Sequence, residues 1–254
     1  MFFYEYVVVI VLVFTRIAAM FSIIPIFGAR NTPMTTKVGL VFFISLIFVP
    51  LQIGNLDIQA DTFLEYGALI VNESIIGFSI GLITLIILNV FYLAGSLVDR
   101  NIGFAMVSVV SAQDESQLPV SANLYYIFAL MIFIVTNVHH ELIRAIAMSY
   151  ETMPIGSSPI LRLITFDYVD LLHYTFEMGF KMAAPFILTV LIANLLLGLL
   201  SKAMPGMNVF MIGMPLKILV GLFLFTLLMP LYPDFIMEIF NEMMRHIYRL
   251  IGIG

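Results

Sequence analysis

The stretch SKAMPGMNVFMIGMPLK, residues 201–217, interrupts a part of the chain that is otherwise apolar. A leucine-rich run precedes it at 188–200, and a second apolar run follows it at 218–231. The dipeptide Pro205-Gly206 ends helices and forms turns, and a lysine stands near each end of the stretch. The pattern therefore predicts two apolar helices that are joined by a short turn into a hairpin.

The composition of the whole chain points in the same direction. Of its 254 residues, 62% are hydrophobic and only 11% are charged, and the mean hydropathy is +1.09. A soluble domain averages about 45–50% apolar and about 25% charged residues. Because the excess apolar residues form long runs, the sequence predicts an all-α, polytopic membrane protein in contact with a lipid bilayer.

Six apolar segments can be marked, at 6–27, 38–53, 68–98, 123–138, 180–200 and 209–231. A bilayer core takes about 20 helical residues, so the third segment is too long for one perpendicular crossing, and the second and fourth are short. Such uneven lengths favour tilted, re-entrant or hairpin helices over six uniform spans. We expect residues 1–254 to form a single domain.

Several functions are disfavoured by residues that the sequence lacks. There is no cysteine, no phosphate-binding GxxxxGK[ST] loop and no GxSxG nucleophile motif. The run His139–Arg144, HHELIR, departs from the zinc protease pattern HExxH because Arg144 stands where the second histidine is needed. A net charge of −5 argues against a nucleic-acid partner. We expect a protein without enzymatic activity, cofactor or metal.

Two ionisable residues lie in or beside apolar segments, Arg16 and Glu73. An unpaired charge in hydrocarbon costs at least about 2.5 kcal/mol, so we predict that the two form a buried ion pair. A structural pair is favoured over a transport or proton-relay role. Nearby, Gly77 and Gly81 form a small-xxx-small pair, which predicts close approach of another helix.

Residues 99–123, DRNIGFAMVSVVSAQDESQLPVSAN, combine an apolar half with a polar, acidic half. An irregular loop exposed to lipid would leave its backbone groups without hydrogen-bond partners. This segment must therefore lie outside the membrane or inside protein that lines a cavity, and its composition favours an ordinary loop.

Residues 194–222, NLLLGLLSKAMPGMNVFMIGMPLKILVGL, resemble the FliR family, a membrane component of the bacterial flagellar protein export gate. Gly206 stands where the family has a glutamine. The stretches 77–104 and 117–156 also resemble the family, so the resemblance covers nearly the whole chain. In 194–222 the family pattern falls on Asn194, Leu197, Gly198, Ser201, Lys202, Ala203, Pro205, Asn208, Phe210, Gly213, Pro215, Lys217 and Gly221.

The resemblance implies a non-enzymatic role in protein transport. FliR-like proteins assemble with FliP-like and FliQ-like subunits into a helical, pore-forming gate, in which their helices pack as hairpins. Unfolded flagellar proteins pass through this gate. FlhA-like and FlhB-like export components are further partners that the resemblance implies. The expected location is the bacterial inner membrane, at the flagellar basal body.

The resemblance also implies roles for particular residues. The loop near 104–120 would reach into the channel as a plug, in which methionine and valine side chains form a deformable apolar seal. Its candidate plug residues are Phe104, Met106, Val107, Val109 and Val110. The candidates for fixing hairpin geometry and subunit contacts are Asn208, Phe210, Pro215 and Lys217.

Two alternatives stay open at this stage. The homologous SctT-type subunit of the virulence secretion gate, or injectisome, shares most of these motifs. A secondary transporter or channel acting alone would need a polar site near the middle of the membrane, for which the candidates are Arg16, Glu73, Asn89 and Asn194.

Overall fold

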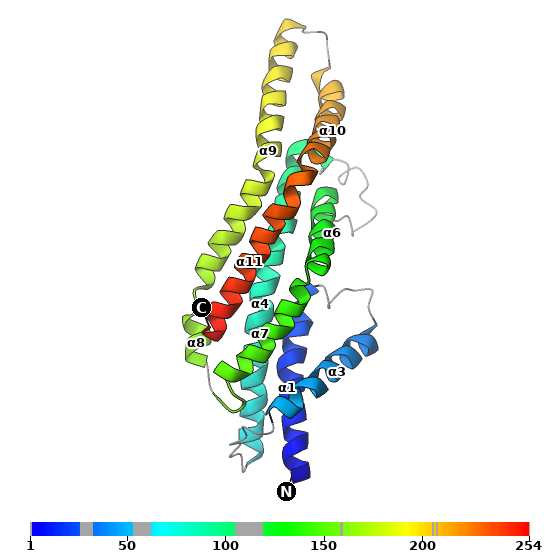
Figure 1. The fold of residues 1–254 in the computed structure, drawn as a ribbon. Helices are drawn as coiled ribbons and strands as arrows, with labels where there is room; N and C mark the ends of the chain where they lie inside the picture. Colours follow the sequence, from blue (N-terminus) through cyan, green and yellow to red (C-terminus); the bar gives the residue numbers. More distant parts are fainter. Residues whose placement is uncertain are drawn as a thin grey trace. The chain divides into compact units, whose positions relative to one another are not determined.

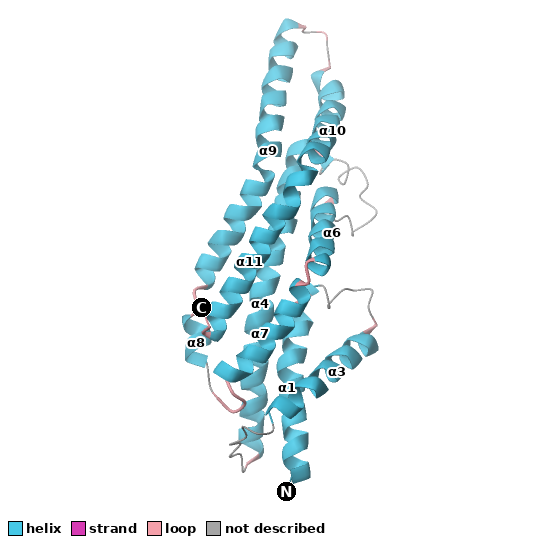
Figure 2. Cartoon of the chain, in the orientation of Figure 1, coloured by secondary structure: helices cyan, strands magenta, loops and turns pink. Residues whose placement is uncertain are grey.

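A computed structural model describes residues 2–25, 33–52, 62–104, 119–157, 160–204, 206 and 208–253. Of residues 2–5, 160–161 and 209–210 it describes the backbone only. Within these ranges nearly every residue is helical and none belongs to a strand (Figure 2). The predicted all-α fold is therefore confirmed.

The helices follow the apolar runs of the sequence (Figure 1). Five are long and apolar enough to cross a membrane, or six if the neighbouring helices α6 and α7 count as one broken span. This confirms a polytopic membrane protein. The described helices are α1 (Phe2–Ile23), α3 (Met34–Gln52), α4 (Phe63–Ile102), α6 (Val120–Val135), α7 (Val138–Thr152), α8 (Ile160–Thr165), α9 (Tyr168–Ala203), α10 (Val209–Leu228), the 3₁₀ turn η2 (Met229–Leu231) and α11 (Tyr232–Ile251).

Two helices are much longer than one perpendicular crossing requires. Helix α4 has 40 residues and α9 has 36. At about 1.5 Å per residue, either one exceeds a hydrocarbon core of about 30 Å. In α9 the charged side chains Glu177 and Lys181 lie before the leucine-rich part and form an exposed ion pair with a distance of 2.7 Å. The apolar part of α9 therefore begins after this pair.

The break between α6 and α7 has a local backbone cause. Asn137 adopts a left-handed conformation with φ 59°, so the α-helical backbone cannot continue through it. Asparagine tolerates this conformation better than most residues that have a Cβ atom. The apolar segment predicted at 123–138 thus ends as a helix at Val135, and a second helix begins at Val138.

The chain divides into two compact units, each built from several separate stretches. Unit 1 comprises residues 1–87, 137–171 and 240–254, and unit 2 comprises residues 88–136 and 172–239. The prediction that residues 1–254 form a single domain stays a prediction. Core residues of unit 1 include Val13, Ile17, Ile24, Ile76, Ile80, Leu142, Ile146 and Ile247, and those of unit 2 include Phe91, Ala94, Val98, Ala129, Phe133, Phe186, Val190 and Ile236.

In unit 1, helix α1 packs against α3 and against the first part of α4. The approach of α1 to α4 is close at two glycines that are one turn apart. A Cβ atom added to Gly77 would overlap the carbonyl oxygen of Arg16, and one added to Gly81 would lie 2.9 Å from the carbonyl oxygen of Met20. The Gly77–Gly81 face therefore packs directly on the backbone of α1, as close packing of membrane helices requires.

In unit 2, aromatic rings fill the space between helices. The ring of Phe225 in α10 lies 4.6 Å from that of Phe186 and 5.1 Å from that of Tyr125, between ring centroids. The hydroxyl oxygens of Tyr125 and Tyr232 are 2.6 Å apart and buried, so these two side chains hydrogen-bond to each other. A buried tyrosine hydroxyl needs such a partner.

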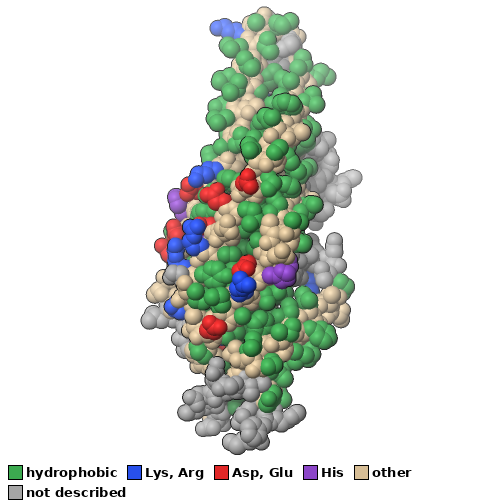
Figure 3. Space-filling model, viewed as in Figure 1, with side chains coloured by type: hydrophobic (Ala, Val, Ile, Leu, Met, Phe, Trp, Pro, Cys, Tyr) green, Lys and Arg blue, Asp and Glu red, His purple; other side chains and the backbone are tan. Residues whose placement is uncertain are grey.

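The part of α9 and α10 that belongs to unit 2 exposes many large apolar side chains, and its visible surface is mostly hydrophobic (Figure 3). In a membrane protein such a surface faces lipid or another subunit. The exposed side chains include Leu188, Leu191, Ile192, Leu195, Leu196, Leu199 and Leu200 of α9 and Met211, Ile212, Leu216, Leu219, Leu222, Phe223 and Leu227 of α10. We call this set the α9–α10 apolar surface.

The close contact at Gly77 predicts a position-specific effect of adding one methyl group. Gly77→Ala should destabilise the purified protein by about 1–3 kcal/mol, because the α1 backbone must move to accommodate the methyl group. Gly67→Ala in the same helix is the matched control, since a Cβ atom there has no neighbour within 4 Å. Equal unfolding midpoints for the two variants in a detergent titration would contradict the close packing.

Candidate functional site

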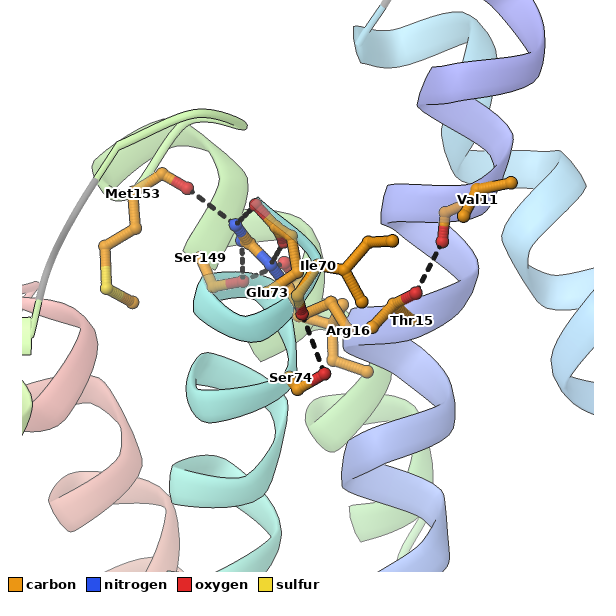
Figure 4. A network of polar contacts seen from close by, with 9 residues as sticks. Val11, Thr15, Arg16, Ile70, Glu73, Ser74, Ser149 and Met153 are labelled. Atoms are coloured by element: carbon orange, nitrogen blue, oxygen red, sulfur yellow. Dashed lines mark hydrogen bonds and ion pairs between the residues drawn. The ribbon is translucent and has the colours of Figure 1, made fainter. Parts of the chain in front are cut away.

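The structure brings Arg16 of α1 and Glu73 of α4 together in unit 1 (Figure 4). Arg16 Nε donates to Glu73 Oε2 at 2.6 Å, and Arg16 Nη2 donates to Glu73 Oε1 at 3.1 Å. Each side chain is only 1% exposed. The two parallel hydrogen bonds form the bidentate arrangement that suits a guanidinium and a carboxylate.

Helix α7 supplies the other partners of the guanidinium (Figure 4). Arg16 Nη1 donates to Ser149 Oγ at 3.0 Å, and Nη2 donates to the carbonyl oxygen of Met153, which directly follows α7, at 2.9 Å. The ring of Tyr150 lies against the guanidinium, with its centroid 4.0 Å from the central carbon. Arg16 thus connects the backbone or side chains of three segments, α1, α4 and the end of α7.

The burial of this pair decides what it can do. Two charges out of water are tolerated only when their mutual attraction is supplemented by further hydrogen bonds. Arg16 makes four hydrogen bonds, to Glu73, Ser149 and Met153. Such a network suits a structural role that selects which helix faces meet. The role itself stays a prediction.

The hairpin residues occupy the start and first turns of α10. Asn208 is the N-cap of this helix, and its Oδ1 accepts from the backbone N–H of Met211 at 3.3 Å. Pro215 lies inside α10, and Lys217 is half-buried one half-turn further on. The side chain of Phe210 lies outside what the structure describes.

Of the candidate plug residues, only Phe104 is described. It is half-buried and follows Gly103, whose φ of 102° ends α4. Phe104 lines a groove of about 750 Å³ between α6 and α10 of unit 2, whose wall is mostly apolar. Met106, Val107, Val109 and Val110 lie outside the described residues.

Sequence reasoning missed two polar contacts of unit 2. One is the Tyr125–Tyr232 hydroxyl pair, and the other joins the carboxylate of Asp99 to the backbone N–H of Ser121. No periodicity signals such partners, because each pair is far apart in the sequence.

In the HHELIR run, Glu141 forms hydrogen bonds with other polar side chains of unit 1. Glu141 accepts from Arg144 Nη1 at 3.1 Å and from the Tyr248 hydroxyl at 3.3 Å. Within the described ranges, no group of three or more His, Cys, Asp and Glu side chains is arranged to hold a metal ion.

The long apolar helices and their buried polar contacts define a polytopic α-helical membrane protein. Residues 7–243 match the family described as bacterial export proteins, family 1. The chain therefore belongs to this family, the FliR family.

Its curated relatives include three flagellar biosynthetic proteins FliR. The protein of Bacillus subtilis (strain 168) is 29% identical over 249 residues, which cover 96% of this chain and 95% of the relative. That of Aquifex aeolicus (strain VF5) is 29% identical and covers 89% and 87% of the two chains. That of Escherichia coli (strain K12) is 30% identical and covers 89% and 86%.

The buried pair predicts that the protein is much less stable with one of the two charged residues than with both or with neither. Arg16→Met or Glu73→Met alone should destabilise the protein by about 3–5 kcal/mol, because each leaves an uncompensated buried charge. The double substitution should recover most of this loss. A detergent unfolding titration of the three variants measures these losses of stability. A loss in the double variant that equals the sum of the two single losses would contradict the pairing.

A matched control for this experiment is Tyr150→Phe. The tyrosine hydroxyl is buried without a hydrogen-bond partner in the described part of the chain, while its ring lies against Arg16. Phenylalanine keeps the ring and removes the hydroxyl, so the unfolding midpoint should be unchanged or slightly raised.

Gly206 allows a test of the position where this chain differs from the FliR pattern. A Cβ atom added there has no neighbour within 4 Å. Gly206→Gln should therefore leave stability and function in cells unchanged within error. A loss of the folded protein in membranes would show that the turn requires glycine.

Proposed function

We propose that this protein is a non-enzymatic subunit of the bacterial flagellar protein export gate, located in the inner membrane at the flagellar basal body. The observation that carries the proposal is the full-length match. Residues 7–243 match a family of bacterial export proteins, and curated relatives named flagellar biosynthetic protein FliR align over 86–95% of their own lengths.

The proposed partners are FliP-like and FliQ-like membrane subunits, and with them FlhA-like and FlhB-like export components. The α9–α10 apolar surface supports such partners. Its leucine-rich helices pack only partly on the rest of their own unit, and they leave large side chains such as Leu191, Leu195 and Phe223 more than half exposed. Other apolar helices would cover these side chains in an assembly.

Lys217 adds a polar element to the proposed subunit contact. It is half-buried within the apolar helix α10, and no described residue forms an ion pair with it. A cation in such a helix is stabilised by a carboxylate or a backbone carbonyl. Asn208, Phe210 and Pro215 would fix the start of the same helix, so that Lys217 is presented to a neighbouring subunit.

We further propose that the segment beginning at Phe104 contributes to the seal of the channel. The sequence from Phe104 to Val110 is apolar except for Ser108, and Phe104 itself lines a mostly apolar groove of unit 2. Apolar side chains exclude hydrated ions, whereas the flexible methionine can repack around different passing chains.

An independent transporter receives less support. Of the four candidates for its polar site, Arg16 and Glu73 are paired with each other and only 1% exposed. The virulence-type gate is the closer competitor, and the relatives described above are flagellar by name.

Affinity purification from membranes tests the gate proposal. A tag on this chain should retain two further small membrane proteins in fixed ratio, and Lys217→Leu should reduce their recovery severalfold. Lys202→Leu is the matched control, because Lys202 is exposed in the last turn of α9. A stable monomer or homodimer without other subunits would contradict the proposal.

The proposed seal has its own test. Deletion of five residues within 106–115 should make membranes that contain the assembled complex leaky to small ions, because the apolar barrier is shortened. Ion flux into inverted vesicles measures this, normalised to the amount of complex. Unchanged flux at normal assembly would contradict the seal.

A further inference from the structure

Helix α6 lacks an N-terminal cap of its own. It begins at Val120 after Pro119, no side chain of its own N-cap residue forms a capping hydrogen bond, and its first turn contains no acidic residue. The first N–H groups of a helix have no partner within the helix and carry partial positive charge. When a helix start is buried, other parts of the fold must therefore supply the acceptors.

Asp99 in the last turns of α4 supplies an acceptor. Its Oδ1 and Oδ2 lie 3.1 and 3.0 Å from the backbone nitrogen of Ser121, which donates to both. Asp99 is 2% exposed and Ser121 is 1% exposed. A carboxylate at a helix N-terminus is stabilised by a charge-assisted hydrogen bond and by the helix dipole.

Gly95, one turn before Asp99 on α4, makes this contact possible. A Cβ atom on Gly95 would overlap the backbone of Ala122, and it would lie 2.6 Å from the carbonyl carbon of Ser121. These neighbours are backbone atoms of the first turn of α6, and they cannot move aside as a flexible side chain can. Gly95 therefore allows α6 to begin directly against α4, and Asp99 then holds it there.

We propose that Gly95 and Asp99 form a clamp that positions the start of α6 for the closed gate. The inference rests on the proposed function. The clamp holds Pro119 and Val120 next to the last turns of α4, which end at Ile102. It therefore fixes the separation of the two described residues, Phe104 and Pro119, on either side of the connection between α4 and α6. Asp99 is a positioning residue, which acts through α6.

A spin-label distance measurement tests the positioning. The chain contains no cysteine, so Arg100→Cys and Asn123→Cys introduce two labels at exposed sites on α4 and α6. The purified complex should give a narrow distance distribution, and single-label samples correct for labelling of other subunits. Asp99→Leu should broaden or shift the distribution. Asp99→Asn keeps the shape and one acceptor oxygen, so it should have an intermediate effect. A distribution unchanged in Asp99→Leu would overturn the clamp.

Ion flux through the assembled complex tests the consequence for the gate. Asp99→Leu and Gly95→Ala should each raise ion flux per complex severalfold, and Asp99→Asn should raise it less. The increase in the double variant Gly95→Ala/Asp99→Asn should be smaller than the sum of the increases in the two single variants. Gly67→Ala and Arg100→Gln are matched controls, because a Cβ atom at position 67 has no neighbour within 4 Å and the Arg100 side chain is exposed. Loss of stability alone would lower the amount of complex without changing flux per complex.

The outcomes separate this inference from the proposed function. If the deletion within 106–115 is leaky but Asp99→Leu is not, the seal stands and the clamp is wrong. If neither variant changes ion flux in a fully assembled complex, the proposed seal itself is wrong. A distance change in Asp99→Leu without a change in flux would likewise overturn the role of the clamp in closure.

Discussion

The buried ion pair between Arg16 and Glu73 is the constraint on which the arrangement of unit 1 depends. Apolar side chains alone distinguish poorly between one membrane helix face and another, because lipid tails are as apolar as leucine. A buried guanidinium has several N–H donors that need acceptors, and few arrangements of the helices provide all of them. Here its partners come from α4 and from the end of α7, so we expect the pair to select which faces of α1, α4 and α7 meet. Gly77 then lets the α1 backbone come close enough for these hydrogen bonds.

Unit 2 also contains buried, paired polar groups between its helices, but they are different groups from those of unit 1. Its buried polar contacts include the Asp99 carboxylate at the start of α6 and the hydroxyl pair of Tyr125 and Tyr232, and both of these anchor α6. Both are buried among apolar side chains, where an unpaired polar group is unfavourable. Each unit therefore combines a general apolar core with a few paired polar groups that select one packing. The α9–α10 apolar surface is left to contacts beyond the chain.

Much of the fold followed from the sequence because long apolar runs and their interruptions have few physical solutions. The runs predicted helices, Pro205-Gly206 predicted a turn, and the isolated charges Arg16 and Glu73 suggested a pair. What could not be predicted depends on contacts between distant residues. Ser149, Tyr150 and the carbonyl group of Met153 are ordinary residues in the sequence, and only the fold places them around Arg16. The break at Asn137 depends on one backbone angle, which the apolar pattern across 123–138 does not encode.

The central claim is that this chain is one subunit of a heteromeric export gate, whose α9–α10 apolar surface is covered by other membrane subunits. Electron cryomicroscopy of the complex purified through a tag on this chain tests it most directly. The account predicts one copy or a few copies of this chain beside other helical subunits around a pore, with Leu191, Leu195 and Phe223 against their helices. An isolated chain or a homo-oligomer with this surface facing only lipid would contradict it.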